Sequence, residues 1–143
     1  MMIMTEKFEI LGKYIKDMSS ETPDAETYIF VKDYISKYQL SIDINSKALK
    51  DKMIEINTIM KFEDKEERKK KSYFEINYAT IIKVNDEIKE KKDLEKIILC
   101  DVQIKIYPHL EKSLLDLLHN SGYPSVKFEK KVDFEKLYNQ KFN

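Results

Sequence analysis

The sequence predicts an α+β domain in which C-terminal helices cover one face of an antiparallel sheet. Apolar and polar residues alternate along several runs in the first two thirds of the chain, and leucines recur at helical spacing after Pro108. Strands that come first and helices that come last are typical of a sheet with helices on one face. Glycine is scarce, with two residues in 143, so no Gly-rich loop can cradle a phosphate, and P-loop and Rossmann folds are excluded.

The first strand is predicted over residues 8–17, where Phe8 and Tyr14 share one face of an alternating run. Pro23 then disfavours continued regular structure. Residues 24–39 hold several aromatic residues without a clean helical or strand period. We interpret this segment as a long crossover that exposes its aromatic side chains.

The middle of the chain predicts three further strands. Residues 40–44 and 53–62 alternate, the second run being rich in β-branched side chains, and residues 72–84 alternate again. The charged stretch 63–71 lies between the last two runs and is most simply a solvated hairpin connection rather than a nucleic-acid patch. Residues 94–100 are apolar, and their periodicity does not distinguish a short helix from a strand.

The last third predicts two helices after one more extended run. Residues 102–107 alternate and are interpreted as the last strand, which ends at Pro108, a residue favoured in the first turn of a helix. An amphipathic helix follows, and Gly122 is expected to end it. The apolar stripe of this helix comprises Leu110, Leu114, Leu117 and Leu118. Asp133 is the predicted N-cap of a short terminal helix. Its apolar stripe comprises Phe134, Leu137 and Tyr138.

Length, charge and cysteine content narrow the possible functions. The chain is expected to form one domain over residues 1–143, because this length supports one core but not two. Lys and Arg total 26 and Asp and Glu total 26, so no global field recruits nucleic acid or an anionic membrane. The single cysteine fits a reducing compartment, and no targeting or membrane-spanning run is apparent. We therefore expect a cytoplasmic protein.

The sequence predicts neither an enzyme nor a cofactor. Cys100 lies in an apolar run, whereas His109 and His119 lie on the predicted helix, so we interpret them as a core thiol and surface imidazoles. One cysteine and two separated histidines do not supply the four ligands of a structural zinc ion, so no metal site is expected. Acidic residues are plentiful, but no spacing singles out a catalytic carboxylate pair.

Several motifs occur in an order that resembles the SecB family of protein-export chaperones. Residues 14–25 resemble the end of the family's first strand, and Lys32-Asp33-Tyr34 resembles part of its crossover loop. The later landmarks that agree in order and spacing are residues 40–45, Tyr73–Ile76, Tyr107-Pro108, Tyr123-Pro124 and residues 132–138. Each motif is weak alone, but the ordered set extends over residues 8–142.

The resemblance implies a four-stranded antiparallel sheet with a long and a short C-terminal helix on one face. It implies a homo-oligomer, a dimer or a dimer of dimers, that holds unfolded preproteins export-competent without ATP and delivers them to the SecA translocase motor. The residues that match the family's SecA-docking positions are Asp17, Glu21, Tyr73 and Glu75. Clustered carboxylates would attract a basic partner, and any zinc in that contact would belong to SecA.

Capture of unfolded chains requires exposed apolar surface with polar rims. Phe30, Tyr34 and Tyr38 of the crossover are the predicted client contacts, and the alternative is that these aromatic residues anchor the loop in the core. Unpaired sheet edges would add main-chain hydrogen bonds to an extended client of any sequence.

The chain also departs from the family. Glu111 stands where members usually carry an arginine, Ala79-Thr80 replaces a Gly-Gly pair, and Asp101-Val102 replaces a Cys-Pro pair. The chain is neutral, whereas most members are strongly acidic and carry an acidic tail. Two alternatives therefore stay open: a SecB-like chaperone devoted to one client such as an antitoxin, and a non-chaperone adaptor that binds one folded partner.

Overall fold

The computed structural model describes residues 6–142 and the side chains of residues 6–140, and it contains one four-stranded antiparallel sheet. The strands are β1 (Phe8–Glu21), β2 (Gln39–Ala48), β3 (Met53–Glu63) and β4 (Tyr73–Val84). Their order across the sheet is β1-β4-β3-β2, so β1 and β2 form its two edges. Each strand overlaps the alternating run that predicted it, and the four-stranded antiparallel sheet is confirmed.

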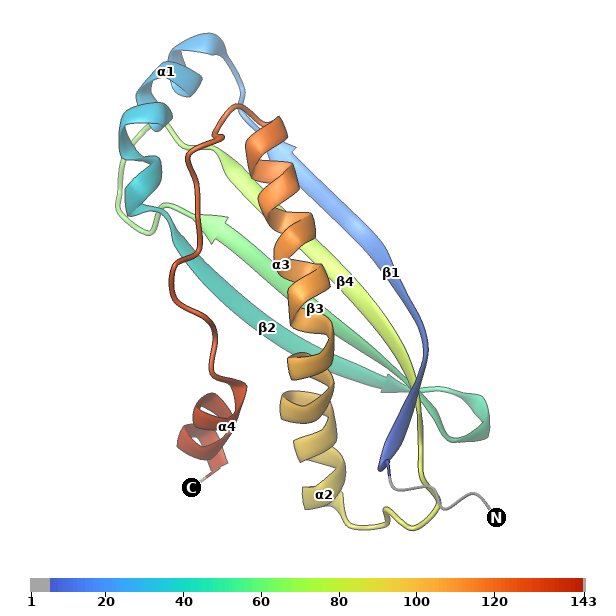
Figure 1. Ribbon diagram of the computed structural model, residues 1–143. Helices are drawn as coiled ribbons and strands as arrows, with labels where there is room; N and C mark the ends of the chain where they lie inside the picture. The colour runs from blue at the N-terminus through green and yellow to red at the C-terminus, as the bar shows by residue number, and fades with distance from the viewer. Residues whose placement is uncertain (1–5, 143) are drawn as a thin grey trace.

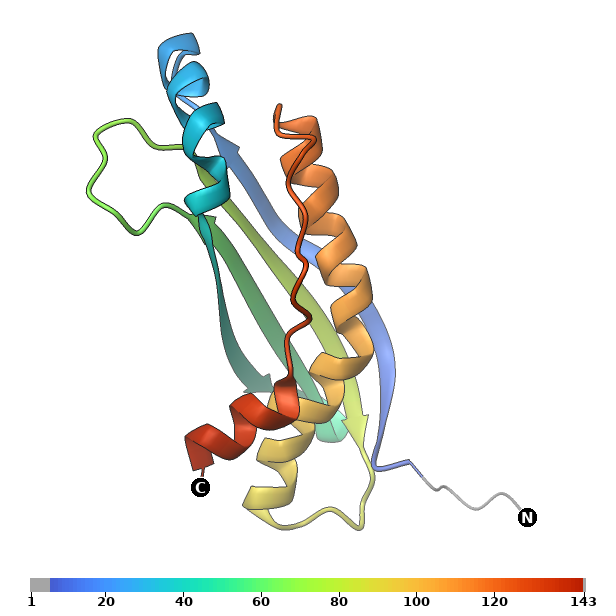
Figure 2. The same cartoon turned by 60° about the vertical axis from the view of Figure 1, so that its left-hand side comes forward.

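Helices cover one face of this sheet, and no described helix lies on the other, as Figure 1 and Figure 2 show. One long rod lies across the strands and consists of α2 (Lys91–Lys96), a π-helical turn (Ile97–Asp101) and α3 (Val102–Asn120). The chain then returns along α3 to α4 (Phe134–Phe142), near the lower end of the rod. At the opposite end of the sheet, α1 (Ala25–Tyr34) and a 3-10 turn (Ile35–Lys37) connect β1 to β2.

The core lies between the sheet and α3. Alternate residues of β3 and β4 point toward the helices. The fully buried apolar ones are Ile56, Met60, Phe74, Ile76 and Ile82. The residues of α3 packed with them are Ile106, Leu110, Leu114 and Leu118. Each such side chain contributes about 1.5–3 kcal/mol by leaving water. The predicted leucine stripe of the long helix is therefore core, except that Leu117 is only partly buried.

Residues 102–107 were predicted as the last strand, and this prediction is wrong because they form the first turns of α3. The buried side chains of the run are Val102, Gln103, Ile106 and Tyr107, which is helical spacing. Gln103 is held inside the core because it accepts a hydrogen bond from Thr58 Oγ1 at 2.9 Å and donates to the Ile98 carbonyl at 3.1 Å. Pro108 therefore lies within α3 and not in its first turn.

Residues 24–39 were predicted as a crossover without regular structure, but they form α1 and the 3-10 turn. Asp24 caps α1, since its Oδ1 accepts a hydrogen bond from the backbone N–H of Thr27 at 2.7 Å. The buried residues of the segment are Thr27, Val31, Ile35 and Tyr38, a helical stripe. Tyr38 is only 6% exposed, so its predicted exposure is wrong, and Phe30 and Tyr34 are half-buried.

Both residues predicted to bound the C-terminal helices have that role. The Oδ1 atom of Asp133 accepts a hydrogen bond from the Lys136 N–H at 3.0 Å and so caps α4. Gly122 follows α3 with a φ of 105°, and the N–H of Tyr123 donates to the Leu118 carbonyl at 3.1 Å. This is the Schellman arrangement, in which a residue with positive φ ends the helix.

The turn between β2 and β3 is expected to gain stability on substitution. Asp51 and Lys52 have φ of 59° and 63°, which is costly for residues with a Cβ, whereas Asn followed by Gly suits such a turn. We expect the double substitution Asp51→Asn/Lys52→Gly to raise the free energy of unfolding by about 1 kcal/mol. Urea unfolding measures the change, and Lys50→Gly, outside the positive-φ pair, should give no gain. Equal gains from both variants would contradict the explanation.

Candidate binding surfaces

The four residues predicted to dock a basic partner lie together on the bare face of the sheet. In β4, Tyr73 and Glu75 alternate with fully buried core residues and so point away from the helices. The β1–β4 register pairs Glu21 with Tyr73 and Ser19 with Glu75, and Asp17 lies two residues further along the same face. We call Asp17, Glu21, Tyr73 and Glu75 the outer patch. Its geometry suits a partner that carries Lys or Arg side chains.

The outer patch concentrates negative charge but also has a lysine within reach. Burial, followed by the carboxylates of Glu75, Glu63 and Glu21, raises the pKa of Tyr73 to about 12. Lys61 pairs with Glu75 in the β3–β4 register and places its Nζ 3.8 Å from Glu75 Oε1. Both side chains are partly exposed, so this pair adds little stability. Glu63 and Lys61 were not among the predicted docking residues, although the alternation of β3 puts both on this face.

The raised pKa of Tyr73 predicts a loss of stability in alkali. Because the folded-state pKa of about 12 exceeds the ordinary value of 10, the stability linked to this group is complete below pH 10 and is lost as the pH rises through about 12. We expect Tyr73→Phe to lose less stability than the wild type above pH 10. Urea unfolding at a series of alkaline pH values measures this difference. Equal pH dependence in both proteins would refute it.

A second polar cluster crosses the bare face beside the outer patch. Lys16 of β1 donates a hydrogen bond to Glu55 Oε1 of β3 at 2.8 Å, and the Tyr14 hydroxyl donates to the same atom at 3.2 Å. The pairing of β1 with β4 is irregular between Ile15 and Asp17, which is where Lys16 lies. The Lys16 hydrogen bond lowers the pKa of Glu55. This cluster fastens the edge strand β1 across β4 to β3.

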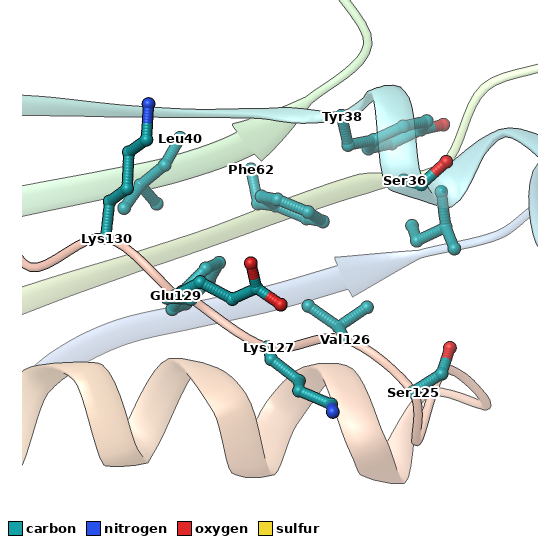
Figure 3. Close-up of a pocket in the computed structure, with 11 residues that line it drawn as sticks. Ser36, Tyr38, Leu40, Phe62, Ser125, Val126, Lys127, Glu129 and Lys130 are labelled. Carbon is teal, nitrogen blue, oxygen red and sulfur yellow. The ribbon is translucent and has the colours of Figure 1, made fainter.

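A groove of about 620 Å³ opens at the α1 end of the molecule, between the start of β2 and the segment that follows α3 (Figure 3). We call it the aromatic groove; it is lined by Ile35, Ser36, Tyr38, Leu40, Phe62 and residues 125–130. The Phe62 ring centroid lies 5.6 Å from that of Tyr38 and 5.7 Å from that of Phe128. The lining also includes exposed serine and charged side chains, which Figure 3 labels: Ser36, Ser125, Lys127, Glu129 and Lys130.

The three aromatic residues predicted to contact a client are not in one place. Tyr38 lines the aromatic groove, and its hydroxyl accepts a hydrogen bond from the backbone N–H of Ser72 at 3.0 Å. Phe30 and Tyr34 lie on α1 with ring centroids 4.7 Å apart and do not line the groove. Phe128 was not among the predicted client contacts, although it is a single aromatic residue between two charged ones, Lys127 and Glu129, and belongs to no predicted strand or helix.

A second hollow, of about 400 Å³, lies further along β2 beside α4. Ile42 and Ile44 line it from β2, and Phe134 and Leu137 line it from α4. Together with Leu40 in the aromatic groove, these two isoleucines occupy alternate, half-buried positions of β2. We call Leu40, Ile42 and Ile44 the β2 strip. It runs along a sheet edge whose described neighbour is β3 alone, so the other edge presents backbone hydrogen-bonding groups.

Cys100 and His119, two of the remaining candidates for chemistry, have structural contacts in the fold. Cys100 is fully buried, and this burial raises the pKa of its thiol, so the thiolate that a nucleophile needs is disfavoured. His119 makes a hydrogen bond through Nε2 with the Val126 carbonyl at 2.9 Å. Among residues 6–142, no three His, Cys, Asp or Glu side chains gather as metal ligands would. Within the same part of the chain, no helix combines the length and apolar character needed to span a membrane.

Comparison with known sequences identifies relatives of this chain. The family model described as preprotein translocase subunit SecB matches residues 3–143. A protein of Pelagibacter ubique, provisionally named protein-export protein SecB, is 61% identical over 140 residues, which cover 98% of this chain and 100% of that protein. Protein-export proteins SecB of Methylocella silvestris and Parvibaculum lavamentivorans are 22% and 24% identical, covering 92% and 94% of this chain and 80% and 79% of their own.

A solved structure agrees with the fold. A SecB-like chaperone of Mycobacterium tuberculosis, in complex with a ChAD peptide from an antitoxin, matches with a TM-score of 0.61 and 11% identity, covering 87% of this chain and 91% of that chain. At this identity the likeness concerns the fold, which both chains share. The family model matches nearly the whole sequence, and a relative in this family is 61% identical. This chain therefore belongs to the SecB family of non-enzymatic protein-export chaperones.

Proposed function

We propose that this protein is an ATP-independent holdase that binds unfolded preproteins in the aromatic groove and along the β2 strip. The observation that carries the proposal is the aromatic groove, whose volume of about 620 Å³ exceeds that of any single side chain and whose apolar centre has a polar margin. Such a site accepts many apolar sequences while the margin limits self-association. A holdase that meets preproteins before export acts in the cytoplasm, which is where we place the protein.

The β2 strip supports the same proposal because it combines side-chain and backbone recognition. Leu40, Ile42 and Ile44 alternate along an edge strand, so an extended client could pair with the β2 backbone while its alternate side chains enter the two hollows. Backbone pairing requires no particular client sequence. The structurally similar SecB-like chaperone was solved with a bound peptide, which supports peptide binding by this fold.

Binding of a permanently unfolded protein tests the proposal. We expect the chaperone to bind reduced, carboxymethylated α-lactalbumin saturably without nucleotide, and to suppress aggregation of a chemically denatured enzyme at stoichiometric oligomer. Native α-lactalbumin is the matched control and should not bind. No binding of the unfolded form, or equal binding of the native form, would overturn the holdase proposal, and the latter result would favour an adaptor for folded partners.

We further propose that the outer patch docks a SecA-type motor. Asp17, Glu21 and Glu75 present carboxylates on one face, where they would speed and orient the approach of a basic peptide. We expect Asp17→Lys/Glu75→Lys to weaken binding of a basic SecA tail peptide about fivefold. Calorimetry or fluorescence anisotropy at low salt measures the affinity.

A charge reversal on the other side of the molecule controls for net charge in this docking experiment. Asp93 of α2 and Asp116 of α3 are exposed, and the double reversal Asp93→Lys/Asp116→Lys, which changes the net charge by the same amount as the outer-patch variant, should leave the affinity for the SecA tail peptide unchanged. Raising the salt concentration should reduce the advantage of the wild type over the outer-patch variant. Equal affinities of the wild type and the Asp17→Lys/Glu75→Lys variant at low salt would exclude the outer patch as the docking site.

We also propose that the protein is a homo-oligomer, a dimer or a dimer of dimers. The edge strand β1 carries large apolar side chains that are 44–47% exposed. They are Leu11, Tyr14, Ile15 and Met18. An exposed apolar edge strand is a surface on which a second sheet edge can pair. Light scattering across a range of concentrations tests this, and a monomer mass at every concentration would contradict it.

A further inference from the structure

Arg68 is the only arginine of the chain, and it connects two segments that are distant in sequence. It lies in the β3–β4 loop (residues 64–72), which lies beside α1 in Figure 1 and Figure 2. Its guanidinium carbon lies 4.7 Å from the centroid of the Tyr34 ring, the last residue of α1. On the loop side, Nη1 donates a hydrogen bond to Asp64 Oδ1 at 2.7 Å. The guanidinium therefore joins the loop to α1.

The Asp64 end of this link is buried, although residues 63–71 were predicted as a solvated hairpin connection. The Asp64 side chain is 1% exposed, and its Oδ1 also accepts a hydrogen bond from the Glu66 N–H at 3.0 Å. Burial opposes ionisation of Asp64, but the Arg68 and Glu66 hydrogen bonds outweigh it, so the pKa is lowered. A buried carboxylate needs a paired cation, and a planar guanidinium can bind it while stacking on an aromatic ring.

The β3–β4 loop contacts the residues on both sides of the 3-10 turn (Ile35–Lys37), and this turn forms one wall of the aromatic groove. Ile35 and Ser36, in the 3-10 turn, line the groove. Tyr34 comes directly before this turn and contacts Arg68. Tyr38 comes directly after it and accepts the Ser72 hydrogen bond described above. The wall is thus fixed at two points to residues 64–72, although Arg68 itself does not line the groove.

We propose that Arg68 is a positioning residue for client binding, because it fixes this wall of the aromatic groove by fastening α1 to the β3–β4 loop. The inference rests on the proposed function of the groove. A second link, between Lys70 and Glu26 at 3.1 Å, is exposed and contributes little by comparison. A wall that is already ordered loses less conformational entropy when a client binds, so removal of the Arg68 link weakens binding without removing a client contact.

The test compares three variants. Asp64→Asn/Arg68→Gln removes the link without leaving a buried charge unpaired. Arg68→Lys keeps the positive charge but loses the planar guanidinium. Lys69→Gln is the control, because it removes one exposed charge from the same loop. The probe is carboxymethylated α-lactalbumin. We expect the double variant to bind it about five times more weakly, Arg68→Lys to be intermediate, and Lys69→Gln to match the wild type.

Hydrogen exchange and outer-patch binding separate positioning from a general loss of structure. Amides of residues 25–38 should exchange faster in the double variant, while exchange in β3 and β4 and affinity for the basic SecA tail peptide stay unchanged. Unchanged exchange in residues 25–38, or faster exchange with unchanged probe affinity, would overturn the inference. Absence of probe binding by the wild type would instead overturn the proposed function, and exchange in residues 25–38 would still decide whether Arg68 fixes the wall.

Discussion

Gly122→Ala is expected to lower the free energy of unfolding by about 2–4 kcal/mol. Gly122 has a φ of 105°, a region that side-chain-bearing residues rarely adopt. A Cβ at this position would also lie 2.5 Å from Tyr28 Cε1, well inside van der Waals contact. Backbone strain and steric overlap therefore act together, and alanine can relieve neither because its Cβ position is fixed by the backbone.

The consequences would extend beyond the end of α3, because Gly122 contacts Tyr28 of α1. The Tyr28 hydroxyl of α1 donates a hydrogen bond to the Gly122 carbonyl at 2.8 Å, and the Tyr28 and Tyr123 ring centroids are 5.3 Å apart. Displacement of Tyr28 by a new Cβ would disturb both contacts. The loss of stability should accordingly exceed that of an ordinary helix C-cap substitution.

The other glycine of the chain provides a matched control. Gly12 lies in β1 and would have no atom within 4 Å of an added Cβ, so Gly12→Ala should change stability by no more than about 0.5 kcal/mol. Urea unfolding followed by circular dichroism measures both variants. If Gly122→Ala is too unstable to purify, the overlap is relieved in Tyr28→Leu/Gly122→Ala, and comparison of this double variant with Tyr28→Leu isolates the cost of the positive φ. Equal stabilities of the two alanine variants would refute the explanation.

The two central strands, β3 and β4, were predictable because each has one buried face. In β4 the buried Phe74 and Ile76 alternate with partly exposed residues, which is the pattern that a sheet covered on one side imposes. Residues 102–107 show where strand alternation misleads. Their apolar residues alternate as in a strand, but the buried ones follow the spacing of a helix. In the helix, Gln103 is buried and bonded to Thr58 of β3, a non-local contact that no local pattern reveals.

Of the candidate binding surfaces, the outer patch could be predicted from the sequence and the aromatic groove could not. The four residues of the outer patch were selected by the family resemblance, and strand alternation places Tyr73 and Glu75 on one face of β4. The aromatic groove could not be predicted, because Phe62 lies in β3 and Phe128 in the segment after α3, and their contact depends on how the chain returns along the sheet. The contact between Arg68 and Tyr34 is non-local for the same reason.

Phe128→Ser is expected to weaken binding of unfolded α-lactalbumin by more than about tenfold. Phe128 is half-buried, lines the aromatic groove and lies edge-on to Phe62, so its ring offers the accessible part of the apolar centre. Large aromatic side chains in a desolvated pocket carry a disproportionate share of binding free energy. Substitution by serine removes that surface and opens the groove to water. Titration of the fluorescently labelled unfolded protein measures the affinity.

Phe30→Ser is the matched control, because it removes an aromatic ring of the same size and similar exposure from α1, outside the groove. Its effect on probe affinity should be less than about twofold, since less than 0.5 kcal/mol of binding free energy would be lost. The comparison decides between the groove and the crossover aromatic residues as the client site. A larger loss for Phe30→Ser than for Phe128→Ser would transfer the site to α1, while equal small losses would place client binding outside both.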